Sequence, residues 1–463
     1  MRTNADKFFE NIKNKKVAFC GLGRSHIPVI KLFREKNIHV IACDSSEEIK
    51  FEKEIENLKN LGVEIRLGKN CLENLDMDII FRTPGMNFSS PDLIRARNNG
   101  IIVTSEMELF FDLCPCKIIG ITGSDGKTTT STIIYEILKK AGKKVYLGGN
   151  IGKPLLPIID SITDSDFVVV ELSSFQLISM RKSPDIAIIT NIEPNHLDVH
   201  KDMNEYIEAK KNIISHQTAF SKTVLNLDNE ITREFSESVR GNVNLFSLNK
   251  KVSFGAFVEN DRIYYSDGKT KHFIIKTSDI KIPGLHNVEN YLASICAVFD
   301  FVSIYDIDFV AKNFNGVEHR IEFVREVNGI KFFNDSIASS PTRVIRGILS
   351  LFDKKIILIA GGYDKKIPFD KLGPVIVDKV KVLILMGQTA SKIENSIKNS
   401  SSFYNSNLKI FHVDNMDNAV KVAMENASFG DIVSLSPACA SFDLYKNFDQ
   451  RGKHFKSIVN KLL

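Results

Sequence analysis

The chain has 463 residues, of which 43% are hydrophobic and 25% charged, as in a folded protein of roughly two to four domains. Its net charge of +5 comes with scattered lysines, and no apolar run approaches the about 18 residues that span a bilayer, so neither nucleic acid nor membrane is an expected partner. The N-terminus lacks an apolar signal segment and the seven cysteines are dispersed, so we expect a cytoplasmic protein with reduced, structural cysteines.

Residues 16–111 alternate short apolar runs with polar helical stretches, which predicts a parallel α/β domain. The predicted strands are KVAFC (16–20), HVIAC (39–43), EIRL (64–67), DIIF (78–81) and IIVT (101–104). The first is followed by Gly21 and Gly23 and the second by Asp44, as in a dinucleotide-binding fold, but His26 occupies the third glycine position. The turn after the first strand could therefore bind NAD, bind another nucleotide diphosphate, or be a βα turn without a ligand. A second tight turn, TPGM at 83–86, follows the fourth strand.

The sequence GITGSDGKTTT at 120–130 follows a β-branched strand and predicts a phosphate-binding loop. Its glycines allow backbone amides to face an anion, and the following helix offers its positive N-terminal end. Lys127 would contact the terminal phosphates and Thr128 would give its hydroxyl to Mg²⁺. The spacing departs from GxxxxGK[ST], since five residues separate Gly120 from Gly126, and a chance glycine-rich turn is the alternative. We expect a nucleoside triphosphate as the ligand.

Carboxylate and imidazole groups follow two further strands of this central unit. The strand at 166–171 ends in Glu171, which could hold Mg²⁺ or lie at the surface. The strand at 185–191 leads to His196 and Asp198, although histidine is an unusual ligand for Mg²⁺ and His196 could equally be a loop histidine.

Amide and amine side chains of the central unit are less specific. Asn150 lies in the run VYLGGNIG (145–152), a strand that leads into a glycine-rich turn, and Lys210, in a helix at 206–214, reads as a surface lysine. Asn287 and Asn290 fall three residues apart on one helical face, which suits either the edge of a base or helix capping.

The C-terminal unit again alternates strands and helices. Strands are predicted at 330–333, 355–360, 380–386 and 431–435, and polar or glycine-rich loops follow them at 334–339, 361–365, 387–389 and 436–441. Because such loops share one sheet edge, we expect them to hold a small charged substrate.

Together these motifs resemble the ATP-dependent Mur ligases of peptidoglycan synthesis, and the resemblance covers nearly the whole chain. The shared motifs are GITGSDGKTT (120–129), ELSSFQ (171–176), TNIEPNHLD (190–198), GLHNVEN (284–290) and EHR (318–320). Three C-terminal runs are similar to the member that adds D-glutamate: NDS (334–336), GGYDK (361–365) and SPACASFDLYKNFDQRG (436–452).

The resemblance implies an α/β fold with three domains. They are a Rossmann-like UDP-binding domain (1–111), a central P-loop-type ATPase domain with a mainly parallel sheet (112–316) and a Rossmann-like amino-acid-binding domain (317–463). It also implies that ATP and two Mg²⁺ ions drive addition of D-glutamate to UDP-N-acetylmuramoyl-L-alanine through an acyl phosphate, in a monomer.

Roles for individual residues follow from the same resemblance. ATP binding is expected at Gly123, Ser124, Asp125, Gly126, Lys127, Thr128, Thr129, Asn287, Asn290 and Arg320. The metal ligands are Thr128, Glu171, His196 and Lys210 as a carbamate, with Lys127, His196 and Lys210 catalytic. The UDP substrate is assigned to Gly23, Arg24, Ser25, Asp44, Ser45, Gly85 and Asn150, and D-glutamate to Ser339, Lys365, Ser441 and Phe448.

Two residues depart from the pattern of some members of the family. Ile337 replaces a lysine expected beside the D-glutamate carboxylate, and Ser46 replaces an arginine near uracil. The alternatives are a sibling ligase or folylpolyglutamate-type ligase for another amino acid, an NAD-dependent oxidoreductase, and a nucleotide-binding scaffold without activity.

Overall fold

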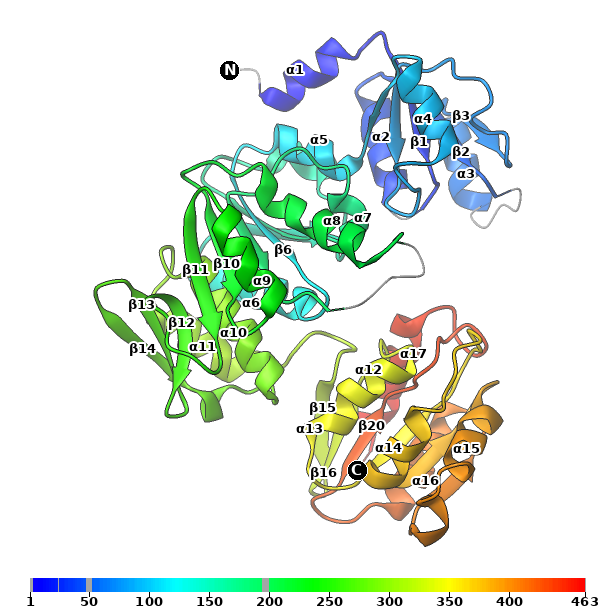
Figure 1. The fold of residues 1–463 in the computed structure, drawn as a ribbon. Coiled ribbons are helices and arrows are strands. Elements are labelled where there is room, and N and C mark those ends of the chain that lie inside the picture. The colour runs from blue at the N-terminus through cyan, green and yellow to red at the C-terminus, as the bar shows by residue number, and fades with distance from the viewer. Residues whose placement is uncertain (1–2, 24, 47–51, 194–199, 463) are drawn as a thin grey trace. The chain divides into compact units, whose positions relative to one another are not determined.

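A computed structural model describes residues 3–23, 25–46, 52–193 and 200–462 of the chain. The chain divides into two compact units, Met1–Lys281 with Leu285–Asn313, and Ile282–Gly284 with Phe314–Leu463 (Figure 1). The first unit contains two sheets and the second contains one. Each sheet is flanked by helices, as the predicted α/β architecture requires.

The N-terminal sheet is entirely parallel, with strand order β3-β2-β1-β4-β5. Its elements are α1 (Asn4–Asn11), β1 (Lys16–Cys20), α2 (His26–Glu35), β2 (His39–Asp44), α3 (Glu52–Asn60), β3 (Glu64–Leu67), β4 (Ile79–Arg82), α4 (Pro91–Asn98), β5 (Ile102–Thr104) and α5 (Glu106–Leu113). All five predicted strands form, within one residue of the expected bounds. The order reverses between β1 and β4, so the loops after these two strands meet at the edge where such sheets bind ligands.

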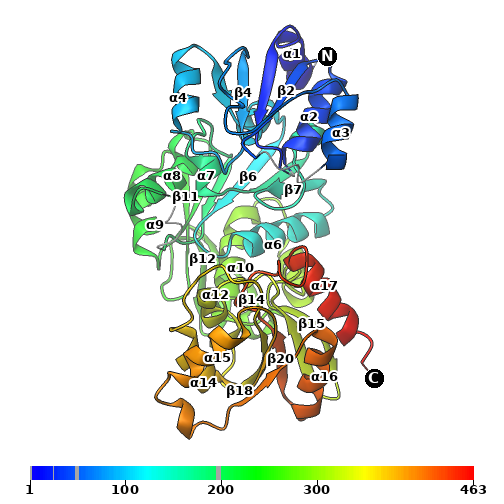
Figure 2. The ribbon, with the colours of Figure 1, turned by 90° about the vertical axis from the view of Figure 1, so that its right-hand side faces the viewer.

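Over the described residues, the central sheet has nine strands in the order β14-β13-β12-β11-β10-β9-β6-β8-β7. Its elements are β6 (Lys117–Thr122), α6 (Lys127–Lys140), β7 (Val145–Gly149), η1 (Leu156–Ser161), β8 (Phe167–Glu171), α7 (Ser174–Leu177), β9 (Ile186–Ile189), α8 (Met203–Ser215), β10 (Lys222–Asn226), α9 (Glu230–Glu234), η2 (Phe235–Ser238), β11 (Asn242–Ser247), β12 (Phe254–Glu259), β13 (Arg262–Asp267), β14 (Lys271–Lys276), η3 (Thr277–Asp279), α10 (Leu285–Val298) and α11 (Ile304–Asn313). The strands from β7 to β12 are parallel, and β12, β13 and β14 form an antiparallel extension that the sequence analysis did not identify. Helix α10 packs against α6 (Figure 2).

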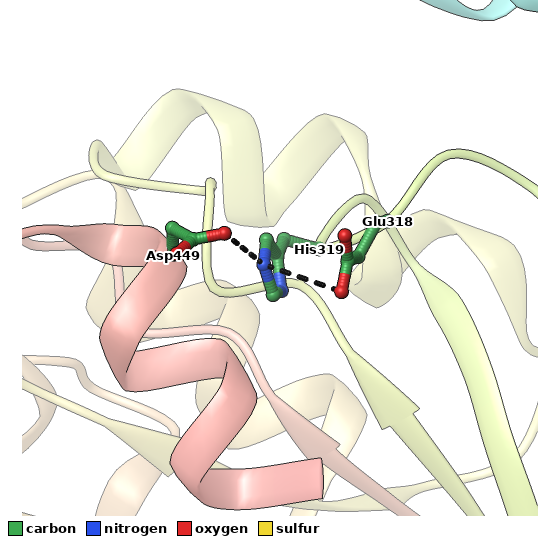
Figure 3. Close-up of side chains that lie close together, drawn as sticks. All are labelled: Glu318, His319 and Asp449. Atoms are coloured by element: carbon green, nitrogen blue, oxygen red, sulfur yellow. Dashed lines mark hydrogen bonds and ion pairs between the residues drawn. The ribbon is translucent and has the colours of Figure 1, made fainter.

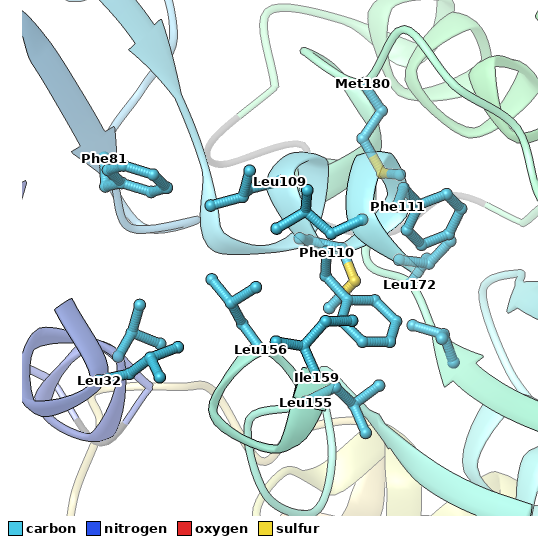
Figure 4. Packing of buried hydrophobic residues seen from close by; sticks show 14 of the residues in the cluster. Leu32, Phe81, Leu109, Phe110, Phe111, Leu155, Leu156, Ile159, Leu172 and Met180 are labelled. Carbon is cyan, nitrogen blue, oxygen red and sulfur yellow. The ribbon is translucent and has the colours of Figure 1, made fainter. Parts of the chain in front are cut away.

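The two sheets of the first unit share one hydrophobic cluster (Figure 4). Phe110 of α5 lies among Leu155, Leu156 and Ile159 of the η1 segment, and the same cluster reaches Phe81 of the N-terminal sheet. These side chains are buried, and each fully buried side chain of this size contributes about 1.5–3 kcal/mol relative to exposure. The N-terminal and central domains are therefore joined by a common core.

The C-terminal sheet has the order β15-β16-β20-β17-β18-β19; the β15–β16 pair is antiparallel and the other four pairs of described strands are parallel. Its elements are β15 (Glu322–Val327), β16 (Ile330–Asn334), α12 (Pro341–Arg346), α13 (Ile348–Leu351), β17 (Ile356–Ala360), α14 (Leu372–Lys379), β18 (Val380–Leu385), α15 (Ala390–Lys398), η4 (Phe403–Asn405), β19 (Lys409–His412), α16 (Met416–Asn426), β20 (Ile432–Leu435) and α17 (Phe448–Val459). Helices α14 and α15 cover one face and α16 and α17 the other, each over its own apolar cluster (Figure 2). Among the described residues, no helix is long and apolar enough to cross a membrane.

Candidate active site

The predicted phosphate loop connects β6 to α6 and depends on its glycines. Gly123 has φ 149° and Gly126, the N-cap of α6, has φ 80°, a region that side chains disfavour. A Cβ atom on Gly123 would overlap the Thr190 hydroxyl, and one on Gly126 would lie 2.5 Å from Oδ1 of Asn290. Lys127 Nζ donates to the carbonyl oxygens of Gly123 at 2.9 Å and Ser124 at 3.0 Å, which places the ammonium at the loop.

Three elements bring oxygen-rich side chains to the start of α6. Thr128 Oγ1 donates to Glu171 Oε2 at 2.7 Å, and Asn150 Nδ2 donates to Glu171 Oε1 at 2.9 Å. Glu171, at the end of β8, is only 2% exposed, which excludes the surface interpretation of this residue. Because Mg²⁺ prefers hard oxygen ligands, the adjacent Thr128 hydroxyl and Glu171 carboxylate fit such an ion. His196 and Asp198 lie outside the described residues.

Lys210 of α8 is buried beneath the phosphate loop, so its interpretation as a surface lysine is wrong. Its exposure is 2%, and Nζ donates to the Gly123 carbonyl at 2.8 Å and lies 3.3 Å from Thr122 Oγ1. Burial, with a smaller contribution from the positive charge of Lys127, lowers the pKa of Lys210 to about 6. The amine is therefore neutral, and hence nucleophilic, near pH 7. The pattern of apolar residues along the helix did not predict this burial, because a lysine within a helix is normally exposed and nothing in the local sequence marks this one as buried.

The loop after β9 is bonded to the phosphate loop through Thr190, Glu193 and Tyr206, to which no individual role was assigned from the sequence. Ser124 Oγ accepts from the Glu193 amide at 2.8 Å and lies 2.9 Å from the Tyr206 hydroxyl. Thr190 Oγ1 donates to the carbonyl of Asp125 at 2.6 Å. These bonds fix the segment that leads to His196 against the loop that would hold phosphate.

Helix α10 also contacts the start of α6. Asn290 Oδ1 accepts from Thr130 Oγ1 at 3.1 Å, and Asn290 Nδ2 donates to Asn287 Oδ1 at 3.2 Å. The two asparagines therefore share one helical face, as predicted, and Asn290 is buried at the N-terminus of α6. Thr129, also assigned to ATP, is buried on α6.

In the N-terminal domain, Asp44 stabilises the turn after β1. Its carboxylate accepts from the Leu22 amide at 2.8 Å and from the Ser46 amide at 2.9 Å. His26 is buried, lies 2.9 Å from the Gly21 carbonyl through Nδ1, and has its pKa lowered to about 4 by burial. A neutral buried histidine thus fills the place of the third glycine of a dinucleotide loop.

The remaining residues assigned to the UDP substrate lie at the same sheet edge. Gly23 and Ser25 follow β1, Ser45 follows β2, and Gly85 follows β4. Gly23, Ser45 and Gly85 are exposed and Ser25 is half-buried, whereas Arg24 lies outside the described residues.

Three loops assigned to D-glutamate meet at the carboxyl edge of the C-terminal sheet. The Tyr363 amide donates to the Ala440 carbonyl at 3.0 Å, which joins the loop of Lys365 to that of Ser441. Ser336 Oγ donates to the Phe448 carbonyl at 2.8 Å and so joins the NDS loop, which continues to Ser339, to α17.

Arg451, which the sequence analysis did not select within its run, holds these loops together. Its guanidinium donates to the carbonyls of Ser336 at 2.9 Å, Cys439 at 3.0 Å and Ala440 at 3.0 Å. Ile337, the first departure, is half-buried, and Arg343 Nη1 lies 3.4 Å from its carbonyl oxygen, so a cation is present beside this position.

The EHR segment forms a hydrogen-bonded cluster with α17 (Figure 3). His319 is buried with φ 66°; its Nε2 lies 3.1 Å from Asp449 Oδ1 and 3.8 Å from Glu318 Oε1. The Asn334 amide lies 2.8 Å from Nδ1, and Lys456 pairs with Glu318 at 3.0 Å. The Asn334 amide nitrogen can only donate, so Nδ1 of His319 accepts from it, and the cluster is a hydrogen-bond network that joins the EHR segment to α17.

Comparisons with known proteins agree with the arrangement of three domains. Residues 15–105 match the MurD-like N-terminal domain of Mur ligases, residues 121–298 the Mur ligase middle domain, and residues 319–439 the glutamate ligase domain of Mur ligases. The chain is 53% identical to the UDP-N-acetylmuramoylalanine–D-glutamate ligase of Acetivibrio thermocellus and 49% identical to that of Clostridium botulinum. Both matches cover 100% of each chain.

Solved structures share the fold at low sequence identity. The UDP-N-acetylmuramate–alanine ligase of Thermotoga maritima has a TM-score of 0.60 at 19% identity, covering 96% of this chain and 99% of its own. MurF of Acinetobacter baumannii has a TM-score of 0.60 at 14% identity, covering 98% of each chain. These likenesses bear on the fold alone.

Proposed function

Since the chain belongs to the Mur ligase family, we propose that it is an ATP-dependent ligase that joins D-glutamate to UDP-N-acetylmuramoyl-L-alanine in peptidoglycan precursor synthesis. The observation that carries this proposal is the identity of about one half over the full length to relatives with that activity in their names. Two observations support the proposal: a phosphate loop beside Thr128 and Glu171, and three joined loops at the edge of the C-terminal sheet, since the reaction needs a nucleotide site and an amino-acid site.

The reaction has to bring together two anions that repel each other, the carboxylate of the UDP substrate and the γ-phosphate of ATP. The terminal carboxylate of the UDP substrate attacks the γ-phosphorus of ATP, the bond to the β–γ bridging oxygen breaks, and an acyl phosphate and ADP form. The amine of D-glutamate then attacks the acyl carbon, a tetrahedral intermediate collapses, and phosphate leaves. Lys127 would neutralise charge on the transferred phosphoryl group, which is the main electrostatic requirement of the first step.

We infer that this chain would hold Mg²⁺ through Thr128 and Glu171, and a second ion through His196 and a carbamate on Lys210. Bound Mg²⁺ would screen the phosphate charges. Lys210 can supply the carbamate because its amine is neutral and buried: its lone pair adds to CO₂, and the nitrogen loses a proton. A position that sequence reads as positive would then become an anionic ligand.

The amino-acid and nucleotide sites are assigned in the same way. Gly123 to Thr129, with Asn287, Asn290 and Arg320, would bind ATP, and the loops after β1, β2 and β4 would bind the UDP moiety. Ser339, Lys365, Ser441 and Phe448 would bind D-glutamate. We further propose that the enzyme acts as a monomer in the cytoplasm, where its nucleotide substrates are found.

Phosphate release measured with ATP and UDP-N-acetylmuramoyl-L-alanine tests this proposal. The amino acid is varied among D-glutamate, L-glutamate, L-alanine, L-lysine and meso-diaminopimelate. Release that requires D-glutamate is expected. Release with another member of the panel would keep the ligase chemistry but overturn the assignment of the C-terminal loops, and release with none of them would contradict the function.

A further inference from the structure

Arg82 is a buried cation between the two sheets of the first unit, outside the residues assigned above. It ends β4 immediately before the TPGM turn, and it is only 1% exposed. Burial lowers the pKa of its guanidinium, while the negative charge of Glu108 raises it. Arginine nevertheless stays protonated in proteins, so a full positive charge lies in this core. Such a charge is costly to bury and calls for a reason.

The guanidinium contacts both domains at once. Nη1 donates to the carbonyl of Met86 at 3.1 Å, which closes the turn after β4. Nη2 donates to the Phe175 carbonyl at 3.0 Å and to Ser179 Oγ at 2.6 Å, both in the central domain. The planar fork of arginine can hold such divergent acceptors in a fixed geometry, which a lysine ammonium cannot.

The acceptors on the central side are connected to the catalytic segments. Phe175 lies in α7, four residues after Glu171, and its ring stacks on His200 with centroids 4.9 Å apart and planes 5° apart. His200 lies 2.9 Å from Ser174 Oγ and 3.1 Å from the carboxylate of Glu205, a residue of α8. Helix α8 also carries Lys210, so a continuous series of contacts joins the turn after β4 to this lysine.

A negative charge lies near Arg82, on the carboxylate of Glu108. Ser179 Oγ donates to Glu108 Oε2 at 3.2 Å, and Ser105 Oγ donates to the same oxygen at 2.8 Å. The Ser179 hydroxyl of the central domain therefore bridges the Arg82 guanidinium and the Glu108 carboxylate by two hydrogen bonds. Breaking such a buried pair by removing one partner leaves the other uncompensated.

We propose that Arg82 is a positioning residue, which holds the UDP-substrate turn after β4 in register with the Glu171–Phe175 segment and α8. The inference rests on the proposed function, in which one domain holds the UDP substrate and the other holds ATP. The attacking carboxylate and the γ-phosphorus are then aligned only if the two domains are fixed relative to each other. A displacement of about 1 Å at such a centre costs roughly 100-fold in rate.

The test compares R82M, which removes the charge at similar volume, with R82K, which keeps the charge but not the fork. Arg97→Met is the matched control, because Arg97 donates to the Phe88 carbonyl at 2.9 Å and touches the same loop only from within the N-terminal domain. We expect kcat/KM for the UDP substrate to fall about 100-fold in R82M and less in R82K. The KM for ATP should change less than about twofold, and R97M should behave as wild type.

A double variant separates positioning from simple charge neutralisation. R82M/E108Q removes both buried charges, so its melting temperature should return towards that of the wild type while kcat/KM stays low. Recovery of kcat/KM in the double variant, or an unchanged kcat/KM in R82M, would overturn the inference; R82K serves if R82M does not fold. A wild type that binds both nucleotides but forms no product would instead contradict the proposed function.

Discussion

Replacing Lys210 with methionine tests whether the buried amine is neutral, which carbamate formation requires. The pKa of Lys210 falls from 10.5 to about 6 on folding, mainly through burial. Between these values the unfolded chain binds a proton that the folded chain does not. The unfolding free energy of the wild type should therefore rise by about 1.4 kcal/mol per pH unit over this window. The penalty is complete below about pH 6 and vanishes above the pKa of the unfolded chain.

Whether Lys210→Met is more or less stable than wild type depends on the size of the cost of burying the amine. At pH 7 the buried amine costs the wild type about 5 kcal/mol relative to high pH, and at pH 9 about 2 kcal/mol. The variant avoids this cost but leaves the carbonyl of Gly123 and the hydroxyl of Thr122 without the amine, which costs about 2 kcal/mol in total. Lys210→Met should thus be more stable than wild type near pH 7, and the difference should vanish near pH 9.

The assay is urea unfolding followed by far-ultraviolet circular dichroism, because the chain has no tryptophan. It is carried out in buffers free of CO₂ and Mg²⁺. Lys211→Met is the control, since Lys211 lies on the same helix but is half-buried and its Nζ lies 5.4 Å from the Phe235 ring centroid. Parallel pH profiles of wild type and Lys210→Met would show that the amine is charged in the folded state and would refute the reasoning. Ligase activity of Lys210→Met should fall at least about 100-fold.

Three further changes probe the other assigned groups. Glu171→Gln should raise the Mg²⁺ concentration for half-maximal turnover about tenfold, measured by metal titration, and an unchanged midpoint would remove Glu171 from the metal site. Gly126→Ala should weaken ADP binding at least about tenfold by calorimetry, because φ 80° strains alanine and its Cβ meets Asn290; normal binding would show that the loop tolerates a side chain. Lys365→Ala should raise KM for D-glutamate but not for ATP, and parallel changes in both would contradict its assignment.

The parallel sheets could be predicted from sequence because their strands are apolar runs that end in recognisable loops. The strands β1, β8, β17 and β18 all begin and end within one residue of expectation. The segment from β10 to β14 was missed, although the Asn260-Asp261 turn of its hairpin, with φ 50° and 56°, is a recognisable signal. The strands β13 (RIYYSD) and β14 (KHFIIK) are short and have charged residues at both ends, so neither contains an apolar run as long as those of the parallel strands β8 and β17.

Site residues could be predicted where a suitable side chain stands at the end of a predicted strand. They could not be predicted where the role of a side chain depends on its burial in the folded chain. Thr128 and Glu171 follow strands of the same sheet, so their proximity was expected from topology alone. The burial of Lys210 beneath Gly123 depends on how α8 packs, which no local pattern records. Arg82 was missed for the same reason, since its partners lie 93 and 97 residues away along the chain.

In the proposed reaction, ATP activates the substrate carboxylate for attack by D-glutamate. The most direct measurement uses UDP-N-acetylmuramoyl-L-alanine labelled with ¹⁸O in its terminal carboxylate, with ATP, Mg²⁺ and D-glutamate, and mass spectrometry of both products. We expect a UDP product that has gained one glutamyl residue, and phosphate that carries one ¹⁸O atom. Phosphate without ¹⁸O, released while the UDP substrate remains unchanged, would mean that water attacks ATP and that no acyl phosphate forms.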